Sequence, residues 1–377
     1  MTQSFETRAL VLQGGGALGA YQAGAYEALA AAGETPDWVA GISIGAINAA
    51  IIAGNTLDDR SDRLRAFWDL VSSNLPGKPI LPGTDARQWF NEWAAASALL
   101  RGIPGFFAPR IPLPLPFQST STATLGYYDT TPLQQTLESL IDFDLLNDGP
   151  TRLSVGAVNI ETGNFAYFDT ARQKLTTKHI MASGALPPGF PPVEIDGAYY
   201  WDGGLVSNTP LQYVLDMHEA DQDICIFQVD LFAASGSRPS SMFDIAQREK
   251  DIRYSSRTRL NTDMAKQTVY LRKAARQLLK SLPKSERSTK EAKQLSAMTE
   301  GSSVTIVHLI HRPESTDTQS KDYEFSRLSV NEHWATGCDD AETSLTHPKW
   351  KARTIPEDGI QVFDLTGTGL SKKDRQT

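Results

Sequence analysis

The sequence is poor in cysteine and has no long apolar run. Its 377 residues include two cysteines, Cys225 and Cys338, which lie far apart and form no metal-type spacing. A secreted disulfide scaffold needs more cysteines, so this pattern favours a reducing cytoplasm. The N-terminus has no basic region leading into an apolar stretch, and we expect no signal peptide. Residues 39–54 are the most apolar segment, but they fall short of the ~20 residues of a transmembrane helix and predict buried core.

Positive charge is scarce outside one segment. The chain carries a formal charge of -8, yet residues 246–295 contain 14 Lys and Arg against 5 Asp and Glu. One interpretation is a solvated helix face. The other is a surface for peripheral attachment to anionic lipid of the inner membrane, where each cation contributes ~1 kcal/mol. We expect no nucleic-acid partner, because the rest of the chain is acidic and no recognition motif occurs.

The first half of the chain alternates short apolar runs with helical patterns. This order is typical of an α/β fold with a parallel sheet between helices. The predicted strands are residues 8–13, 38–42, 152–159, 164–169 and 224–231, and the predicted helices are residues 20–32 and 45–53. Residues 152–159 and 164–169 are expected to form a strand pair that turns at Thr162 and Gly163.

Two further regions differ in character. Residues 75–128 are rich in proline and aromatic residues and include the run from Pro112 to Pro116. Proline disfavours regular helices and central strands, so we interpret this insertion either as a loop packed on the body or as an apolar flap over a lipid-binding cleft. Beyond Pro239 the patterns predict a long cationic helix, a strand at residues 304–309, a helix that begins at a capping box from Ser329 to Glu332, and a disordered polar tail.

A nucleophile motif follows the strand predicted at residues 38–42. Gly41, Ser43 and Gly45 form G-x-S-x-G between that strand and the next helix. At such a turn the serine projects from a strained junction, and the glycines remove Cβ atoms that would clash. The sequence therefore predicts that Ser43 is a nucleophile.

A run of glycines follows the first predicted strand. Gly14, Gly15 and Gly16 open a helix, where exposed backbone N–H groups and the helix dipole favour negative charge. This arrangement predicts an oxyanion hole. With Gly19 the run also matches the dinucleotide-binding pattern G-x-G-x-x-G, but no acidic residue ends the next strand, so we reject that interpretation.

The third motif is Asp202 followed by Gly203 and Gly204. Taken alone, this aspartate is more typical of a turn, although a carboxylate within hydrogen-bond reach of a serine can accept its proton. A general α/β-hydrolase would need a histidine late in the chain and more strands before Ser43. None of the histidines stands in a catalytic motif; they are His179, His218, His308, His311, His333 and His347.

Together, the three motifs resemble the patatin-like phospholipases in order and spacing across residues 8–235. The segment from Met181 to Val193 and the pair Asn208 and Pro210 also resemble that family. The resemblance implies a three-layer α/β fold with a mostly parallel central sheet. It also implies a histidine-free dyad in which Ser43 is the nucleophile and Asp202 the general base.

The C-terminal part is weaker in resemblance. Residues 236–377 are similar to a helix-rich extension on some bacterial members, judged by Asp322 to Ser326 and by His333 with Trp334. We therefore expect a hydrolase domain at residues 1–235 and a basic extension at 236–377. One departure concerns Leu18, where many members carry Arg or Lys. The missing cation leaves open whether phospholipids or neutral esters are the substrates.

The predicted function is that of a serine esterase or phospholipase A-type acyl hydrolase acting on lipid esters. It needs no metal or cofactor, works through an acyl-enzyme, and lies in the cytoplasm. A carboxylate is a weak base unless desolvated, so an apolar pocket should surround the dyad. Two alternatives stay open: an esterase or thioesterase for hydroxyalkanoate-type or other acyl substrates, and a membrane-recruited regulatory protein with an idle site.

Overall fold

We describe the fold from a computed structural model of the chain. The described residues are 5–75, 77–79, 82–112, 121–218, 222–236, 238–239, 242–299, 303–312, 318–354 and 359–366; the side chains of residues 243, 256–261 and 265 are excluded. The tail beyond Gly369, which the sequence predicts to be disordered, lies outside these residues.

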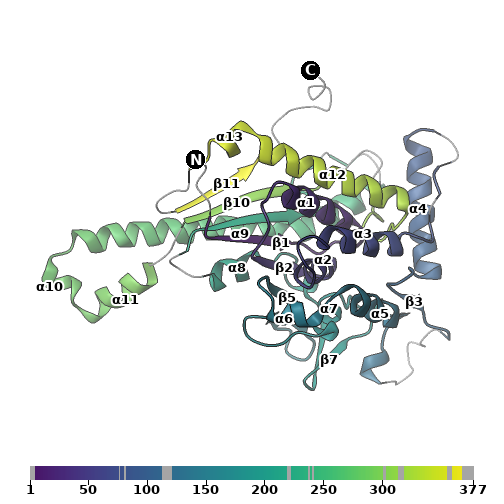
Figure 1. The fold of residues 1–377 in the computed structure, drawn as a ribbon, viewed down its shortest axis with the longest axis horizontal. Helices are drawn as coiled ribbons and strands as arrows, with labels where there is room; N and C mark the ends of the chain where they lie inside the picture. The colour runs from purple at the N-terminus through teal and green to yellow at the C-terminus, as the bar shows by residue number, and fades with distance from the viewer. Residues whose placement is uncertain are drawn as a thin grey trace.

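A twisted central sheet organises the molecule (Figure 1). Its strands run in the order β11 (Gly359–Asp364), β10 (Ser303–Ile310), β9 (Ile224–Asp230), β1 (Thr7–Leu12), β2 (Trp38–Ile42), β5 (Arg152–Asn159), β8 (Ala198–Asp202) and β7 (Val193–Ile195). The pairs from β11 to β5 are parallel, whereas β8, β7 and β6 (Phe165–Asp169) pair antiparallel. Functional groups at the carboxyl ends of β1, β2 and β9 therefore meet at one edge of the sheet.

Helices cover both faces of this sheet. One core contains Leu10 and Leu12 of β1 with residues of α1 (Gly19–Ala31), α2 (Ile44–Ala53) and α12 (Arg327–Thr346), whereas Ala9 and Val11 point into a second core with α8 (Leu211–Met217). This alternation follows from the two-residue repeat of a strand. The protein has the three-layer α/β fold that the sequence predicts.

Shorter elements complete the body. They are η1 (Gly16–Leu18), α3 (Arg60–Val71), α4 (Thr84–Arg101), β3 (Ala108–Pro109), η2 (Thr122–Thr124), β4 (Tyr128–Asp129), α5 (Thr131–Leu140), α6 (Phe143–Asp148), α7 (Thr177–Ser183), η3 (Gly203–Leu205) and α13 (Pro348–Lys351). Strands β3 and β4 form a small antiparallel ladder near α4.

The insertion is more regular than predicted. Residues 84–101 form the helix α4, although we expected the whole segment at 75–128 to be irregular. The prolines lie on either side of this stretch, and residues 83–103 contain none, so nothing interrupts the helix. Phe117 and most of the proline run from Pro112 to Pro116 lie outside the described residues.

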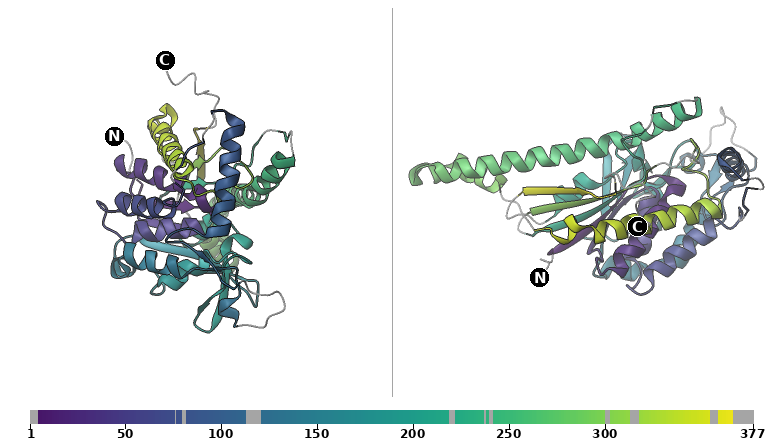
Figure 2. Two further views of the ribbon diagram at one scale, coloured as in Figure 1. Left: turned by 90° about the vertical axis from the view of Figure 1, so that its right-hand side faces the viewer. Right: turned by 90° about the horizontal axis from the view of Figure 1, so that it is seen from above.

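The C-terminal part both extends the sheet and projects from it. Strand β10 pairs with β9, and β11 pairs with β10, so residues beyond 236 continue the same sheet as β1. Helix α9 (Met242–Ser281) runs away from the body and returns through α10 (Lys284–Arg287) and α11 (Lys290–Thr299) (Figures 1 and 2). These elements carry the basic segment 246–295, and its cations Arg272, Lys273 and Lys280 are exposed.

One helix start differs from the prediction. Helix α12 begins at Arg327, and the hydroxyl of Ser326 caps it by accepting the Ser329 N–H at 3.3 Å. We had placed the start at Ser329 with Glu332 closing a capping box. Glu332 instead forms an ion pair with Arg87 of α4 at 2.5 Å, and so it contributes to tertiary packing.

No helix among the described residues is both long enough and apolar enough to cross a bilayer.

Candidate active site

The turn between β2 and α2 holds Ser43 in a strained conformation. Its backbone has φ 56° and ψ −125°, and Ser43 precedes the first residue of α2. A Cβ on Gly41 would lie 2.2 Å from the Gly45 carbonyl oxygen, and a Cβ on Gly45 would lie 2.4 Å from the Leu12 carbonyl oxygen. Both neighbours must therefore be glycine. Backbone strain of this kind collects at functional turns, and here it points the hydroxyl into a pocket.

Ser183 fixes this turn from the side. The backbone N–H of Ser43 donates to the Ser183 hydroxyl at 3.0 Å, and that hydroxyl donates to the Gly156 carbonyl oxygen at 2.7 Å. Ser183 ends α7 and is fully buried. The sequence analysis gave Ser183 no role; only its place in the family-like segment from Met181 to Val193 marked it.

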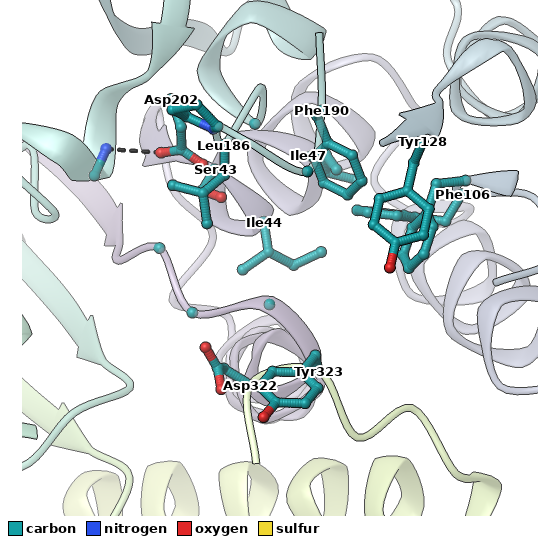
Figure 3. A pocket seen from close by; sticks show the side chains of 18 of the residues that line it. Ser43, Ile44, Ile47, Phe106, Tyr128, Leu186, Phe190, Asp202, Asp322 and Tyr323 are labelled. Atoms are coloured by element: carbon teal, nitrogen blue, oxygen red, sulfur yellow. Dashed lines mark hydrogen bonds between the residues drawn. The ribbon is translucent and has the colours of Figure 1, made fainter. Parts of the chain in front are cut away.

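Asp202 lies against Ser43 at the end of β8. Figure 3 shows the Ser43 side chain beside the Asp202 carboxylate, and the Gly204 N–H donates to Oδ1 at 2.7 Å. The Asp202 side chain is 2% exposed. Burial raises the pKa of Asp202 from 3.8 to about 6, although the neighbouring Ser43 and the Gly204 N–H act in the opposite direction. A carboxylate with this pKa can accept a serine proton at neutral pH much better than an exposed one.

The glycine run between β1 and η1 offers two backbone donors. Within the described residues no acceptor is recorded for the N–H groups of Gly15 and Gly16. Gly14 is different, because its N–H donates to the Asn208 carbonyl oxygen at 3.1 Å. This corrects the prediction that all three glycines offer donors. The amides still available for a developing negative charge are those of Gly15 and Gly16, before the first turn of α1.

Two contacts hold the glycine run in place. The Asn208 side chain donates to the Gly14 carbonyl oxygen at 2.8 Å. The Ala17 N–H donates to the Asp322 carbonyl oxygen at 2.7 Å, and Gly16 has a φ of +55°. A Cβ on Gly16 would lie 1.9 Å from that same Asp322 oxygen. A residue from the C-terminal part therefore rests directly on the predicted oxyanion hole.

The histidines stand apart from this arrangement. Each of them lies within the described residues, and none lines the pocket or has a recorded hydrogen bond to Ser43 or Asp202. The positions concerned are His179, His218, His308, His311, His333 and His347. The local geometry thus brings a carboxylate, and no imidazole, to the serine.

A cavity of about 310 Å³ opens beside Ser43 and Asp202. This size is at the lower end of ligand sites. Its lining is mainly apolar, and Figure 3 shows Phe106, Tyr128 and Phe190 grouped on one side of it. The further apolar and aromatic lining residues are Ile44, Ile47, Leu99, Phe107, Leu186, Pro187, Pro188, Phe232, Tyr254, Tyr323 and Phe325. An apolar pocket around the pair, expected from the weak basicity of a carboxylate, is present.

Distant parts of the chain build this cavity. Leu99, Phe106 and Phe107 come from the proline- and aromatic-rich insertion, which favours the second of its two interpretations, an apolar cover over a cleft. Tyr254 of α9 and Tyr323, which precedes α12, come from the C-terminal part. No sequence motif marked Tyr254, and Tyr323 was marked only by its place in the family-like segment from Asp322 to Ser326.

Charge in the cavity wall is negative. Among the described residues, the lining includes the carboxylates of Asp202 and Asp322 but no Lys or Arg, and Asp322 is paired with Lys250 at 2.7 Å. Leu18, at the position where a cation was missing in the sequence, is fully buried in the core. The described residues contain no group of three His, Cys, Asp or Glu side chains that could hold a metal ion.

Two family models match this chain. A family model described as patatin-like phospholipase matches residues 10–215, and a second one described as patatin phospholipase matches residues 252–357. No curated protein matches the chain significantly. Among solved structures, the crystal structure of VipD from Legionella pneumophila is similar at 16% identity and a TM-score of 0.35. That match covers 87% of this chain and 67% of VipD.

Proposed function

Since the chain belongs to the patatin-like phospholipase family, a family of lipid acyl hydrolases, we propose that it cleaves carboxylic esters of lipids through Ser43 and Asp202. The observation that carries the proposal is the buried Asp202 carboxylate, which lies beside the Ser43 side chain in the cavity and has its pKa raised by burial to about 6. It thus supports a serine esterase that needs no histidine.

The acylation step follows from these positions. Asp202 takes the hydroxyl proton as Ser43 Oγ forms a bond to the ester carbonyl carbon. The N–H groups of Gly15 and Gly16 hold the resulting oxyanion. When the tetrahedral intermediate collapses, the bond to the leaving alcohol breaks, and the alcohol takes the proton from Asp202. The products of this step are the free alcohol or lysolipid and an acyl ester on Ser43.

Deacylation reverses the roles. A water molecule attacks the acyl carbon while Asp202 accepts its proton, and the same amides hold the second oxyanion. Collapse breaks the bond to Ser43, which recovers its proton from Asp202. The fatty acid leaves, and the enzyme returns to its starting state.

The lining favours esters without an anionic group near the cleaved bond. Within the part of the chain that the structure describes, the wall contains two carboxylates and no Lys or Arg, and Leu18 is buried, so no described side chain in the wall compensates a phosphate charge. We therefore place neutral lipid esters ahead of phospholipids. Hydroxyalkanoate oligomers and thioesters fit the same dyad and remain the alternative substrates.

A substrate panel tests the proposal. Triacylglycerol, phosphatidylcholine, a hydroxybutyrate oligomer and an acyl thioester are incubated with wild type and with Ser43→Ala, and the released acids are measured. We expect release from neutral esters by wild type only. Equal release by the two proteins would contradict the role of Ser43. No release from any substrate would favour a regulatory protein with an idle site.

A further inference from the structure

Helix α4 presents an apolar stripe to solvent. Trp89, Trp93, Ala96 and Leu100 recur at spacings of four, three and four residues, which places them on one face of a helix. All of them are exposed, with 78% of Trp89, 57% of Trp93 and 79% of Leu100 accessible. The charged residue in this stretch is Glu92, which is half-buried beside the stripe and accepts a hydrogen bond from the Ser320 hydroxyl at 2.9 Å.

The opposite face of α4 is already used for packing. Ala94, Ala95 and Ala98 are buried, and Arg87 is held by the Ser329 hydroxyl at 2.8 Å and by Glu332. A surface helix normally turns its apolar side inward and its polar side to water. In α4 the buried side combines alanines with Arg87, Asn91 and Ser97, whereas the large apolar side chains of the outer stripe face solvent.

The stripe leads directly to the mouth of the cavity. Leu99 lines the cavity and is also exposed. The same holds for Leu186, on another part of the rim. The Tyr128 hydroxyl donates to the Leu99 carbonyl oxygen at 2.8 Å, which joins the end of α4 to the cavity wall. Leu99, next to Leu100 of the stripe, therefore belongs both to the exposed end of α4 and to the cavity wall.

The neighbouring loops extend the same surface. The ladder of β3 and β4 lies at the end of α4, and the Tyr127 N–H donates to the Pro188 carbonyl oxygen at 3.2 Å. Figure 2, left, looks onto this side of the molecule, with α4 upright in front. We call this surface the α4 face; its exposed apolar residues are Trp89, Trp93, Leu99, Leu100, Ile111, Leu125, Tyr127 and Leu186.

A lipid surface fits this face better than the other occupants. Exposed tryptophan and tyrosine beside leucine and isoleucine is the composition that settles at the boundary of a bilayer. Arg101 follows the stripe in the last turn of α4, where it can meet headgroup oxygens. A second protein would cover the rim at Leu99 and Leu186 and close the cavity, whereas a lipid surface would provide acyl chains that can enter it.

We propose that the α4 face inserts shallowly into a lipid surface and that acyl chains pass from there over Leu99 and Leu186 to Ser43. The passage of acyl chains to Ser43 for cleavage rests on the proposed hydrolase function. The attachment of the α4 face to lipid does not depend on that function. It places the contact at the opposite end of the molecule from the basic segment 246–295, which Figure 1 shows on the projecting helices α9 to α11.

Vesicle binding tests the proposal. The protein used is Ser43→Ala, which leaves the lipid intact, with vesicles of phosphatidylcholine. The variant Trp89→Gln, Trp93→Gln and Leu100→Gln should bind at least about tenfold more weakly, because each lost side chain removes apolar area from the bilayer. Binding by the parent should change little with salt, because the stripe is uncharged.

The matched control lies on α9, where three similarly exposed apolar side chains are replaced: Tyr270→Gln, Leu271→Gln and Leu278→Gln. This control should bind within about twofold of the parent, since its positions are far from the α4 face. Equal binding by all three proteins would overturn the proposal. Loss of binding in the control alone would overturn it too, and would place attachment on the basic segment. A dimer that only the α4 variant loses, without vesicle binding, would identify a second copy as the occupant.

Activity separates this proposal from the proposed function. With Ser43 intact, the α4 variant should hydrolyse a soluble short-chain nitrophenyl ester like wild type but turn over vesicle lipid at least about tenfold more slowly. Unchanged turnover of vesicle lipid would overturn the inference. If wild type binds vesicles through α4 but cleaves no ester, the hydrolase function fails and the lipid contact stands.

Discussion

Replacing Asp202 by asparagine should lower activity and raise stability at neutral pH. The wild-type carboxyl is 2% exposed and ionises in the folded protein with its pKa raised to about 6 by burial. In the unfolded chain the group faces water and ionises at about 3.8. Asparagine has nearly the same shape and does not ionise. The variant therefore lacks the proton acceptor, and it also lacks the charge that wild type buries at this position.

The sign of the stability effect follows from proton binding. Between pH 4 and pH 6, approximately, folded wild type binds more protons at this site than unfolded wild type does, so its free energy of unfolding falls as the pH rises. The gap between a pKa of 3.8 and one of about 6 corresponds to about 3 kcal/mol. The stabilisation belongs to the protonated form, and it is lost once the pH exceeds about 6. Asp202→Asn does not show this loss of stability, because asparagine does not ionise.

Activity should move in the opposite direction. Removing a positioned general base typically costs a factor of about 10² to 10⁴ in turnover. For wild type, kcat/KM should rise with pH through about 6 and then level off, because the ionised carboxylate is the active form. The residual activity of the variant should lack this rise.

Urea unfolding across the pH range and ester hydrolysis measure the two effects. The stability of Asp202→Asn minus that of wild type should grow by about 3 kcal/mol between acidic and mildly basic pH. The matched control is Asp322→Asn, which changes a carboxylate of the same cavity that is paired with Lys250 and not with Ser43. A difference that stays constant with pH would refute the buried charge, and full activity in the variant would refute the role of Asp202 as a base.

Further predictions concern the supports of the site. Gly16→Ala should abolish ester hydrolysis, because its Cβ would lie 1.9 Å from the Asp322 carbonyl oxygen. The control is Gly33→Ala, which has a similar positive φ but open space around it, and this variant should stay active in the same assay. Lys321→Met should lower the free energy of unfolding by about 3–5 kcal/mol, since it leaves the buried Asp251 without its partner at 2.8 Å. Adding Asp251→Leu should restore most of that loss in denaturant titrations, and equal stability of the single and double variants would contradict this explanation.

The local parts of the site could be predicted from the sequence. The strand before Ser43 was predicted at residues 38–42 and is found with those bounds, because five buried residues lead into a G-x-S-x-G turn. The strand pair at residues 152–159 and 164–169 also forms, within one residue at its ends. Periodicity and turn residues determine elements of this kind.

Contacts between distant residues could not be predicted in this way. Ser183 and Asn208 both stand in segments that resemble the family, but their hydrogen bonds to Ser43 and Gly14 span 140 and 194 positions. The carbonyl of Asp322 reaches the glycine run from still farther along the chain. Such contacts depend on sheet order and helix docking, which no local pattern encodes. The prediction that the Gly14 N–H is free to hold an oxyanion was wrong for the same reason, because that N–H donates to the distant Asn208 carbonyl oxygen.

Besides the catalytic roles and the substrate class proposed above, three further expectations stay predictions. They are the cytoplasmic location, the domain boundary near residue 235 and the attachment of residues 246–295 to anionic lipid. The exposure of Arg272, Lys273 and Lys280 is compatible with a solvated helix face as well as with such attachment.

Covalent labelling tests the central claim most directly. A fluorophosphonate reacts with a serine only where a base activates the hydroxyl and donors hold the developing oxyanion. Peptide mass spectrometry should place one adduct on Ser43 in wild type, none in Ser43→Ala, and a strongly slowed one in Asp202→Asn. An adduct on a different residue, or no adduct on folded wild type, would contradict a Ser43 and Asp202 dyad.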